Sequence, residues 1–323
     1  MGKYIIKRIL MMIPVLFGVS VLVFLIQAFT PGDPADLVLG AQQSEETKYE
    51  WREKYDLNDN IVVQYGKYMY RLITKGDFGT SYISGTSVNS DLARRLPISL
   101  TLAALATVVA ALIGVPLGIL SAKYRGKWID ALCRVISIVG ISLPIFWFAF
   151  LAIMLFAVNL RWLPVSGLMT PKHWIMPVLV TGILSSASIM RITRSSVLDN
   201  ISQDFVRTAR AKGQKESKIM SHHILRNSMI NIANIIGNQF SNNLGGTAVI
   251  ETCFVITGLG TMMVSAINNR DYTTLRASVL VVALAISVVN LLVDLSFCLI
   301  DPRVKAQYTT GKKKKKKTAE KAA

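Results

Sequence analysis

The chain of 323 residues is 52% hydrophobic and only 17% charged, which is too apolar for an ordinary soluble protein and indicates an integral membrane protein. Its formal net charge of +17 does not indicate a nucleic-acid partner. The positive charge is gathered in short segments between apolar runs and in residues 301–323, a distribution that membrane topology explains without a phosphate-binding surface.

Six apolar runs are long enough to cross ~30 Å of hydrocarbon as helices that rise ~1.5 Å per residue. We expect an all-α integral membrane protein with six transmembrane helices at residues 9–29, 98–120, 135–158, 174–190, 229–250 and 277–300. The first run is too long for a secretory signal and is expected to be a retained anchor. Pro144 is expected to be a packing and kink position in the third span. The fourth run contains Pro177 and Gly182 and should be buried among other helices, and the fifth is weakly hydrophobic.

The distribution of Lys and Arg predicts the orientation. Residues 1–8, 123–127, 191–226 and 301–323 hold 23 of them, whereas two short loops on the other side hold two each. Because short basic loops stay in the cytoplasm, both termini and the loop 191–228 should be cytoplasmic. Residues 1–29 then form the N-terminus and first span, 30–97 an extracytoplasmic loop large enough for a small folded excursion, and 98–300 the transmembrane core. Residues 301–323, with six consecutive lysines, are expected to be a solvated basic tail, with contact to anionic lipid as the alternative.

Several signatures of enzymes and cofactor sites are absent from the sequence. No glycine-rich loop ends in Gly-Lys-Ser or Gly-Lys-Thr, so we expect no ATP binding by that route. No ordered catalytic set is found, and the three histidines are expected in docking or surface roles. We therefore expect no enzyme activity, no bound cofactor and no metal. The cysteines should not form a disulfide, because Cys253 is expected about a bilayer thickness from Cys133 and Cys298.

The segment 202–227 is basic, amphipathic and interrupted by one glycine. Asn200 or Ser202 is expected to cap a helix that has Asp204 in its first turn. One side of this helix, with Phe205 and Ala209, should be small and apolar, and the other side should be basic. Gly213 is expected to supply a turn at the end of the helix. A second short helix over about 215–223 should carry Ile219 and Met220 inward. This helix-turn-helix foot indicates docking of a soluble partner, and the alternative is a surface helix that rests on lipid.

The sequence of this foot resembles a known family. Residues 204–213 (DFVRTARAKG) and 223–227 (HILRN) resemble the cytoplasmic coupling motif of ABC importer permeases, and more narrowly the B-type permease subunit of oligopeptide and dipeptide importers. Segments 31–35, 76–81, 163–167 and 270–272 resemble other loops of this family in the expected order. In the segment 251–260, Thr257 stands where proline is usual, and Arg207 stands where the general permease motif has glutamate.

The resemblance implies a type I importer fold with alternating access in the cell membrane. It implies a second homologous six-span permease subunit, two cytoplasmic ATPases that bind ATP and Mg²⁺, and an extracytoplasmic substrate-binding protein. The residues implied in coupling to the ATPases are Asp204, Phe205, Arg207, Thr208, Ala209, Arg210, Ala211, Lys212, Gly213, Ile219 and His223. Peptides are the expected solute, while nickel chelates, glutathione and sugars stay open.

Amide side chains recur along the fifth span at spacings that place them on one helix face. The candidate residues of the solute pathway are Asn231, Asn234, Asn238 and Asn242, with Asn290 and Asp294 in the sixth span. Such a stripe serves either interhelical hydrogen bonding or a hydrated channel. A secondary transporter, for which Asp294 would be the intramembrane carboxylate, and a structural or receptor-like membrane protein remain the alternative classes.

Overall fold

The computed structural model describes the backbone of residues 2–300 and the side chains of residues 5–295; the expected basic tail and the Cys298 side chain lie outside these ranges. The regular secondary structure of the described chain is helical, and an isolated β-bridge joins Thr80 and Ser87. Its helices are α1 (Gly2–Phe29), α2 (Pro34–Leu39), α3 (Glu45–Lys54), α4 (Ile61–Lys75), α5 (Val88–Lys123), α6 (Trp128–Ser142), α7 (Ile145–Ala152), η1 (Ile153–Asn159), α8 (Lys172–Ile201), α9 (Asp204–Ala211), α10 (Glu216–Lys218), η2 (Ile219–Ile224), α11 (Leu225–Cys253), α12 (Leu259–Asn268) and α13 (Tyr272–Ile300). The predicted all-α class is confirmed.

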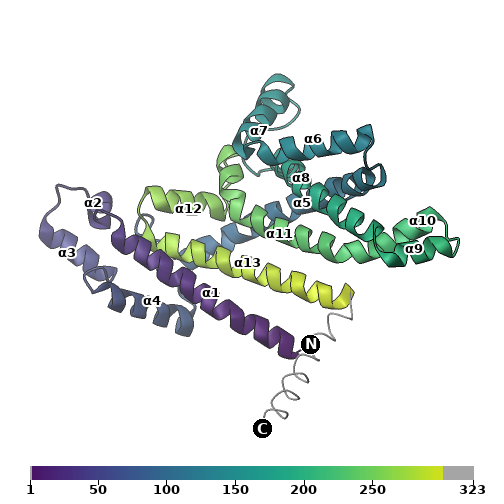
Figure 1. Cartoon of the computed structure of the whole chain (residues 1–323). Coiled ribbons are helices and arrows are strands. Elements are labelled where there is room, and N and C mark those ends of the chain that lie inside the picture. Colours follow the sequence, from purple (N-terminus) through teal and green to yellow (C-terminus); the bar gives the residue numbers. More distant parts are fainter. Residues whose placement is uncertain (1, 301–323) are drawn as a thin grey trace, which may run out of the picture.

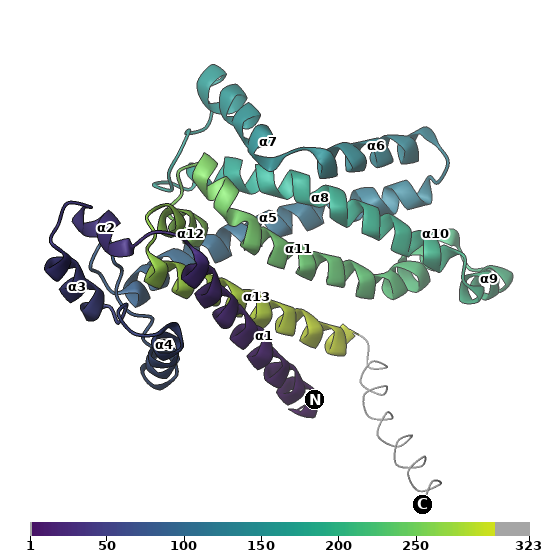
Figure 2. The same ribbon diagram turned by 60° about the vertical axis from the view of Figure 1, so that its left-hand side comes forward.

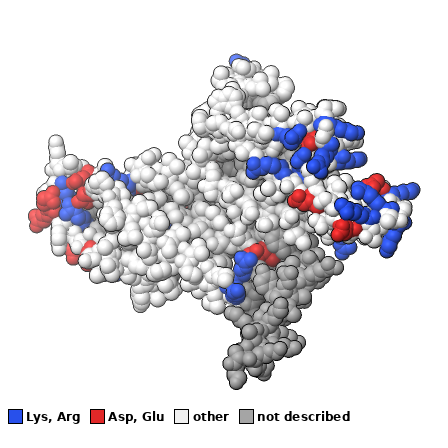
Figure 3. Space-filling view, viewed as in Figure 1, with Lys and Arg blue, Asp and Glu red and all other residues white. Residues whose placement is uncertain are grey.

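The long helices run roughly alongside one another between two different ends (Figures 1 and 2). One end carries the small helices α2, α3 and α4. The other carries α9 and α10, the turn between α5 and α6, and the N-terminus of α1. On the face shown in Figure 3, charged side chains gather mostly at these two ends, and the surface between them is largely uncharged. This pattern is typical of a protein whose middle lies in hydrocarbon.

Four of the described helices are long and apolar enough to cross a membrane: α1, α5, α8 and α13. A fifth span is obtained if α6 and the α7–η1 segment are taken together. The kink expected at Pro144 is present, but the third run is not one continuous helix, because its two parts are bent by 101°. Leu143 precedes Pro144 and has an extended backbone (φ −73°, ψ 127°), the conformation that a following proline favours, so α6 ends there.

The other spans differ from expectation mainly in their ends. α5 begins at Val88, well before residue 98, and Pro97 lies inside it. α8 extends to Ile201, and 61% of its most apolar window is buried, against 17% for α1 and α13. The prediction that the fourth span lies among other helices is confirmed. α11 is 29 residues long but is not among the helices that qualify by composition.

Small residues allow α5 and α8 to pack closely. A Cβ added at Gly114 would lie 2.6 Å from the Ser186 carbonyl oxygen, and one at Gly118 would lie 2.6 Å from Cβ of Thr193. Both distances are far inside van der Waals contact. The α5–α8 contact is the most extensive between any two helices described. These two helices therefore form the centre of the bundle, by the small-residue packing that is common in membranes.

A buried polar network joins α11 to this pair. Asn243 donates to the hydroxyl of Thr107 on α5 (3.0 Å) and accepts from the hydroxyl of Ser185 on α8 (2.8 Å). Gln239 donates to Ser185 and Asn243 at 3.2 and 3.1 Å. Because hydrocarbon offers no hydrogen-bond partners, these side chains satisfy one another and fix the register of the three helices.

The end that carries α2–α4 is fastened to α13 by a buried arginine. The guanidinium carbon of Arg276 lies 4.3 Å from the ring centre of Phe24 on α1 and 5.0 Å from that of Tyr68 on α4. Burial raises the pKa of Tyr68 to about 12, so its hydroxyl stays protonated beside the cation. The positive charge is thus stabilised by two aromatic faces, and it ties α1, α4 and α13 together.

A buried aspartate fastens the adjoining turn before α5. Asp271 accepts hydrogen bonds from the Ser81 hydroxyl (2.5 Å) and the Tyr82 amide (3.2 Å). It also accepts from the hydroxyl of Thr274 in α13 (2.7 Å). The start of α13 therefore anchors two segments that are far apart in the sequence, and the small helical module is held firmly on the bundle.

We predict that Gly118→Val destabilises the bundle, because the added side chain collides with α8 and forces the two central helices apart. The cost should be about 1–3 kcal/mol, as for other overpacked cores. The measurement is the thermal unfolding midpoint of the purified protein in detergent. Gly18→Val on α1 is the matched control, because a Cβ at Gly18 meets nothing within 4 Å. Equal midpoints for the two variants would contradict this account of the α5–α8 contact.

Candidate coupling site

The turn that ends α9 depends on a glycine, as the sequence predicts. Gly213 has φ +71°, in the left-handed region that strains residues with a Cβ. Its amide donates to the carbonyl of Arg210 (2.9 Å), and the Gln214 amide donates to the carbonyl of Ala209 (3.3 Å). These bonds close the C-terminus of the helix and reverse the chain.

The predicted N-cap of this helix is wrong. The N-cap is Gln203, and its side chain makes no capping hydrogen bond. Asn200 and Ser202 belong to the end of α8, where their side chains donate to the carbonyls of Ser196 (2.8 Å) and Asp199 (2.9 Å). The reason is that α8 continues to Ile201, beyond its apolar run, so these polar side chains are already used by the preceding helix.

The predicted second short helix is not separate. α10 passes directly into the π-helical segment η2 and then into α11, without a break between Glu216 and Cys253. Ile219 is fully buried and Met220 is partly buried, so the prediction that they face inward is confirmed. The foot therefore includes the first part of the long helix that follows it.

One side of α9 is packed against the ends of the central helices. Val206 is fully buried and Ala209 nearly so. The cluster that encloses them, here called the base cluster, also contains Ala122 of α5, Val197 of α8, and Ile219 and Ile224 of η2. Four segments of the chain thus meet in one apolar contact. As a result, α9 is fixed to the ends of both α5 and α8.

The other side of α9 faces outward. The side chains of Asp204 and Arg207 are 96% and 78% exposed, and Thr208, Ala211 and Lys212 are exposed as well. Phe205, expected on the small apolar side with Ala209, is instead 37% exposed. Val206 occupies the buried position, because Val206 and Ala209 are three residues apart and share a face. An aromatic ring is therefore presented among polar and charged side chains.

Two contacts close the hairpin of the foot. Arg210 donates through Nε and Nη2 to the two carboxylate oxygens of Glu216, at 2.6 and 3.2 Å. These hydrogen bonds hold the pKa of Glu216 below its usual value, so the pair is ionised at neutral pH and is lost only as the pH falls through that lowered pKa. Nε2 of His223 lies 2.8 Å from the side-chain oxygen of Gln214, and this contact spans the base of the turn.

The four asparagines of α11 lie together on an exposed face, as their spacing predicts. Asn231, Asn234, Asn238 and Asn242 are all exposed in this chain. Asn231 donates to the Ser196 hydroxyl (3.1 Å) and Asn238 to the Asn234 side chain (3.4 Å). Most of their hydrogen-bonding capacity is therefore directed away from the rest of the subunit.

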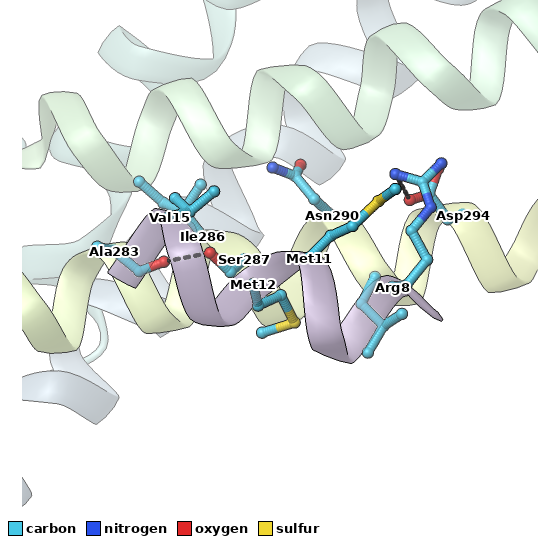
Figure 4. A pocket seen from close by; sticks show the side chains of 10 residues that line it. Arg8, Met11, Met12, Val15, Ala283, Ile286, Ser287, Asn290 and Asp294 are labelled. Carbon is cyan, nitrogen blue, oxygen red and sulfur yellow. Dashed lines mark hydrogen bonds and ion pairs between the residues drawn. The ribbon is translucent and has the colours of Figure 1, made fainter. Parts of the chain in front are cut away.

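The two candidates on α13, Asn290 and Asp294, both line a pocket between α1 and α13 but have different partners. Asn290 accepts a hydrogen bond from the Ser241 hydroxyl of α11 (2.9 Å). Asp294 instead forms an ion pair with Arg8 of α1 (2.9 Å), at one end of a pocket of about 420 Å³ between α1 and α13 (Figure 4). The structure therefore does not bring Asp294 onto the asparagine face.

Glu251 is a buried acidic residue that is not among the sequence-predicted site residues. It is fully buried near the end of α11 and accepts from the Ser99 hydroxyl (2.5 Å) and the Thr261 amide (2.9 Å). A Cβ at Gly258 would collide with its carboxylate. The sequence feature that indicates a buried role for Glu251 is its position in the segment 251–260, directly after an apolar run. Glu251 holds the α11–α12 turn against α5.

Comparison with protein families gives two matches that together extend over most of the chain. A family described as "Binding-protein-dependent transport system inner membrane component" matches residues 114–306. The N-terminal region of such membrane components matches residues 1–103.

Curated relatives are similar over nearly their whole length. The chain is 38% identical to the oligopeptide transport system permease protein AppB of Bacillus subtilis (strain 168), covering 94% of this chain and 99% of that protein. It is also 38% identical to the glutathione transport system permease protein GsiC of Escherichia coli (strain K12), with the same coverage.

Solved structures with a similar fold are also found. A chain of the MetNI methionine ABC transporter in an inward-facing conformation superposes with a TM-score of 0.55 at 15% identity, covering 65% of this chain and 96% of that chain. A chain of an amino acid ABC transporter gives a TM-score of 0.52 at 17% identity, covering 64% and 92%. At these identities the likeness shows the fold.

Two neighbouring residues of α9 should respond differently to the same substitution. Val206→Asp places an unpaired carboxylate in the base cluster and should release the foot, so that proteolytic cleavage within residues 202–218 becomes at least tenfold faster, for a loss of more than about 1.4 kcal/mol of local stability. Phe205→Asp should leave the cleavage rate near that of the unmodified protein, because this side chain faces outward. Equal sensitivity of the two variants in limited proteolysis would contradict the orientation of α9.

Proposed function

The chain belongs to the family of binding-protein-dependent transport system inner membrane components, and on this premise we propose that it is the permease subunit of an ABC importer for peptides. The observation that supports this most directly is the foot, a compact hairpin with one buried and one outward side. In this proposal the subunit supplies half of the solute pathway. Separate ATPase subunits supply the energy.

The proposed topology has six spans and both termini in the cytoplasm. The basic segments 123–127 and 191–226 lie at the same end of the bundle, and the N-terminal end of α1, which carries residues 5–8, is directed toward that end (Figure 1). This end is assigned to the cytoplasm by the retention of Lys and Arg there. α2, α3 and α4 then form an extracytoplasmic module that is available to a substrate-binding protein.

α11 is proposed as the sixth membrane-crossing element. Its 29 residues give a length of about 43 Å at ~1.5 Å per residue, which is enough to cross a bilayer. Its composition is too polar for a lipid-exposed span, because one face carries the asparagines and another carries Asn243 and Gln239. Such a helix is stable in a membrane when one polar face meets other helices and the other meets water or a partner subunit.

The outward side of α9 is proposed to dock in a groove on a cytoplasmic ATPase. Phe205 supplies an exposed aromatic anchor, the type of residue that dominates binding at interfaces, and the surrounding charges supply orientation. Because the base cluster ties α9 to α5, α8 and η2, movement of the ATPase would displace these helices together. In this proposal, closure of the ATPase pair drives the alternation of the pathway.

The asparagine face of α11 is proposed to line the pathway opposite a second, homologous permease subunit. Its amide side chains are neutral and offer both donors and acceptors. A peptide backbone has the same requirements at every residue, whatever its side chains. This match favours peptides, including glutathione, over a solute that requires a fixed charge or a metal ligand, such as a nickel chelate.

A secondary transporter is less well supported. Such a protein is expected to hold coupling carboxylates near the membrane midplane. Asp294 is paired with Arg8, and Glu251 is enclosed by Ser99 and Thr261, so neither carboxylate lies open to the asparagine face. The ABC permease therefore accounts for more of the described residues.

We predict that Phe205→Asp uncouples the subunit without unfolding the foot. Loss of an aromatic anchor should lower the affinity for the ATPase by about thirtyfold or more, equivalent to at least ~2 kcal/mol. The measurement is ATP hydrolysis by the reconstituted complex with and without the loaded binding protein, using peptide, glutathione and nickel-chelate solutes in turn. Stimulation in the variant equal to that of the unmodified complex would refute this docking role.

Gly213→Val should also abolish solute-stimulated ATP hydrolysis, because φ +71° strains a β-branched residue by about 1–2 kcal/mol and the turn would open. Membrane insertion should be unchanged. Gly40→Val is the matched control: Gly40 has φ +94°, its Cβ position is also open, and it lies in the module at the opposite end. Normal stimulation in Gly213→Val, or an equal loss in the control, would overturn the role given to the Gly213 turn.

Cysteine accessibility tests the asparagine face. In a background with the three native cysteines replaced by serine, Asn238→Cys should react with a charged thiol reagent, and its rate should change at least tenfold between the nucleotide-free and ATP-bound complexes. Leu244→Cys is the buried control, since Leu244 is 2% exposed, and should stay unreactive. Uniform protection of Asn238→Cys in both states would exclude it from the pathway.

A further inference from the structure

A basic pocket lies between α6 and α8, close to the turn that joins α5 to α6. It has a volume of about 300 Å³ and is lined by three arginines, Arg134, Arg191 and Arg194, with Ile138 and Met190 on its apolar side. The coupling foot and the asparagine face do not contribute to it, so the proposed function does not account for this pocket.

The charges in this pocket are only partly neutralised. Asp130 is 1% exposed and receives a bidentate ion pair from Arg194, at 2.7 and 2.9 Å, and hydrogen bonds from the Ser121 hydroxyl and the Gly126 amide. The acceptor capacity of the carboxylate is therefore largely used. Arg134 approaches it only at 3.8 Å, and its side chain is 56% exposed.

Arg191 is exposed, and no acidic side chain within ion-pair distance of it is found in the part of the chain that the structure describes. Three guanidinium groups thus line the pocket, and the one carboxylate beside them, that of Asp130, is buried behind Arg194. Arg194, held in place by Asp130, forms one wall, while Arg134 and Arg191 are left as donors. Guanidinium groups bind phosphate oxygens through paired hydrogen bonds, so this arrangement suits a phosphate group.

The surroundings of the pocket are those of a membrane interface. Along α6, next to the pocket, Val135 and Ile138 are 57% and 64% exposed, and Trp128 at the helix start is 73% exposed. Tryptophan is enriched at the headgroup level of a bilayer, and an exposed apolar helix face beyond it is suited to acyl chains. A phosphate site next to this apolar helix face fits an amphiphile better than a free ion.

We propose that this pocket binds the headgroup of an anionic phospholipid, with the phosphate between Arg134 and Arg191 and the acyl chains along the α6 face. Basic pockets between membrane helices at the cytoplasmic side recognise such headgroups, and this leaflet is rich in anionic lipid. This inference goes beyond the proposed transport function and rests on it only for the assignment of this end of the bundle to the cytoplasmic leaflet. A bound lipid would brace the α5–α6 turn against α8, next to the base cluster.

The test measures binding of dioctanoyl phosphatidylglycerol to the purified full-length protein in a neutral detergent by microscale thermophoresis. Dioctanoyl phosphatidylcholine and inorganic phosphate are measured in parallel. Arg134→Gln/Arg191→Gln should weaken phosphatidylglycerol binding about thirtyfold, from roughly 1 kcal/mol for each cationic residue. Arg134→Lys/Arg191→Lys keeps both charges and should keep most of the affinity. The elution profile and unfolding midpoint verify that each variant is folded.

The matched control is Lys123→Gln/Arg125→Gln, which removes the same charge from exposed positions of the neighbouring turn, outside the pocket. It should change the affinity by less than threefold. Equal affinity in the Gln pair and the unmodified protein, an equal loss in the control, or binding of inorganic phosphate as tight as that of phosphatidylglycerol would each overturn the proposal. The assay contains no ATPase or solute, so its failure leaves the coupling proposal standing, and a failure of coupling leaves this result unaffected.

Discussion

The close contact of α5 with α8 is the constraint on which the other parts of the structure depend. Glycines at positions 114 and 118 let the two backbones approach to a distance that excludes any side chain there. The Asp130–Arg194 pair, the base cluster and the Asn243 network are all built on this pair of helices. A membrane offers little hydrophobic force between helices, so dense packing and satisfied polar contacts must hold them together.

The two ends of the bundle are fastened by different physical means. At the end that carries α2–α4, Arg276 and Asp271 hold the helical module through cation–π contacts and hydrogen bonds to a turn. At the other end the foot is held by an apolar cluster and closed by the Arg210–Glu216 pair. Both attachments are extensive, and this is what a subunit needs if force applied at one end is to reach the other.

α11 shows how one helix meets two environments. Its inner side supplies Asn243 to the network with α5 and α8, and its outer side leaves four asparagines exposed. The continuous path from α10 through η2 into α11 connects this polar face to the foot. The helix that is too polar to qualify as a span is therefore the one that links the proposed ATPase contact to the proposed pathway, whereas α1 and α13 present apolar surface.

The sequence alone determined the helical class, the apolar runs, the two charged ends, the glycine turn at Gly213 and the common face of the four asparagines, because each follows from local conformation or spacing. It did not determine the sharpness of the bend at Pro144, the N-cap of α9, the outward position of Phe205 or the pairing of Asp294 with Arg8. Those features depend on contacts between elements. The side chains of Asn200 and Ser202 bond to α8, which extends past its apolar run, and Val206 fills the space at the base cluster. Asp294 meets Arg8 because α1 lies beside α13. The pocket beside Arg134 and Arg191 likewise joins residues from helices far apart in the chain. Only the packing of the bundle brings them together.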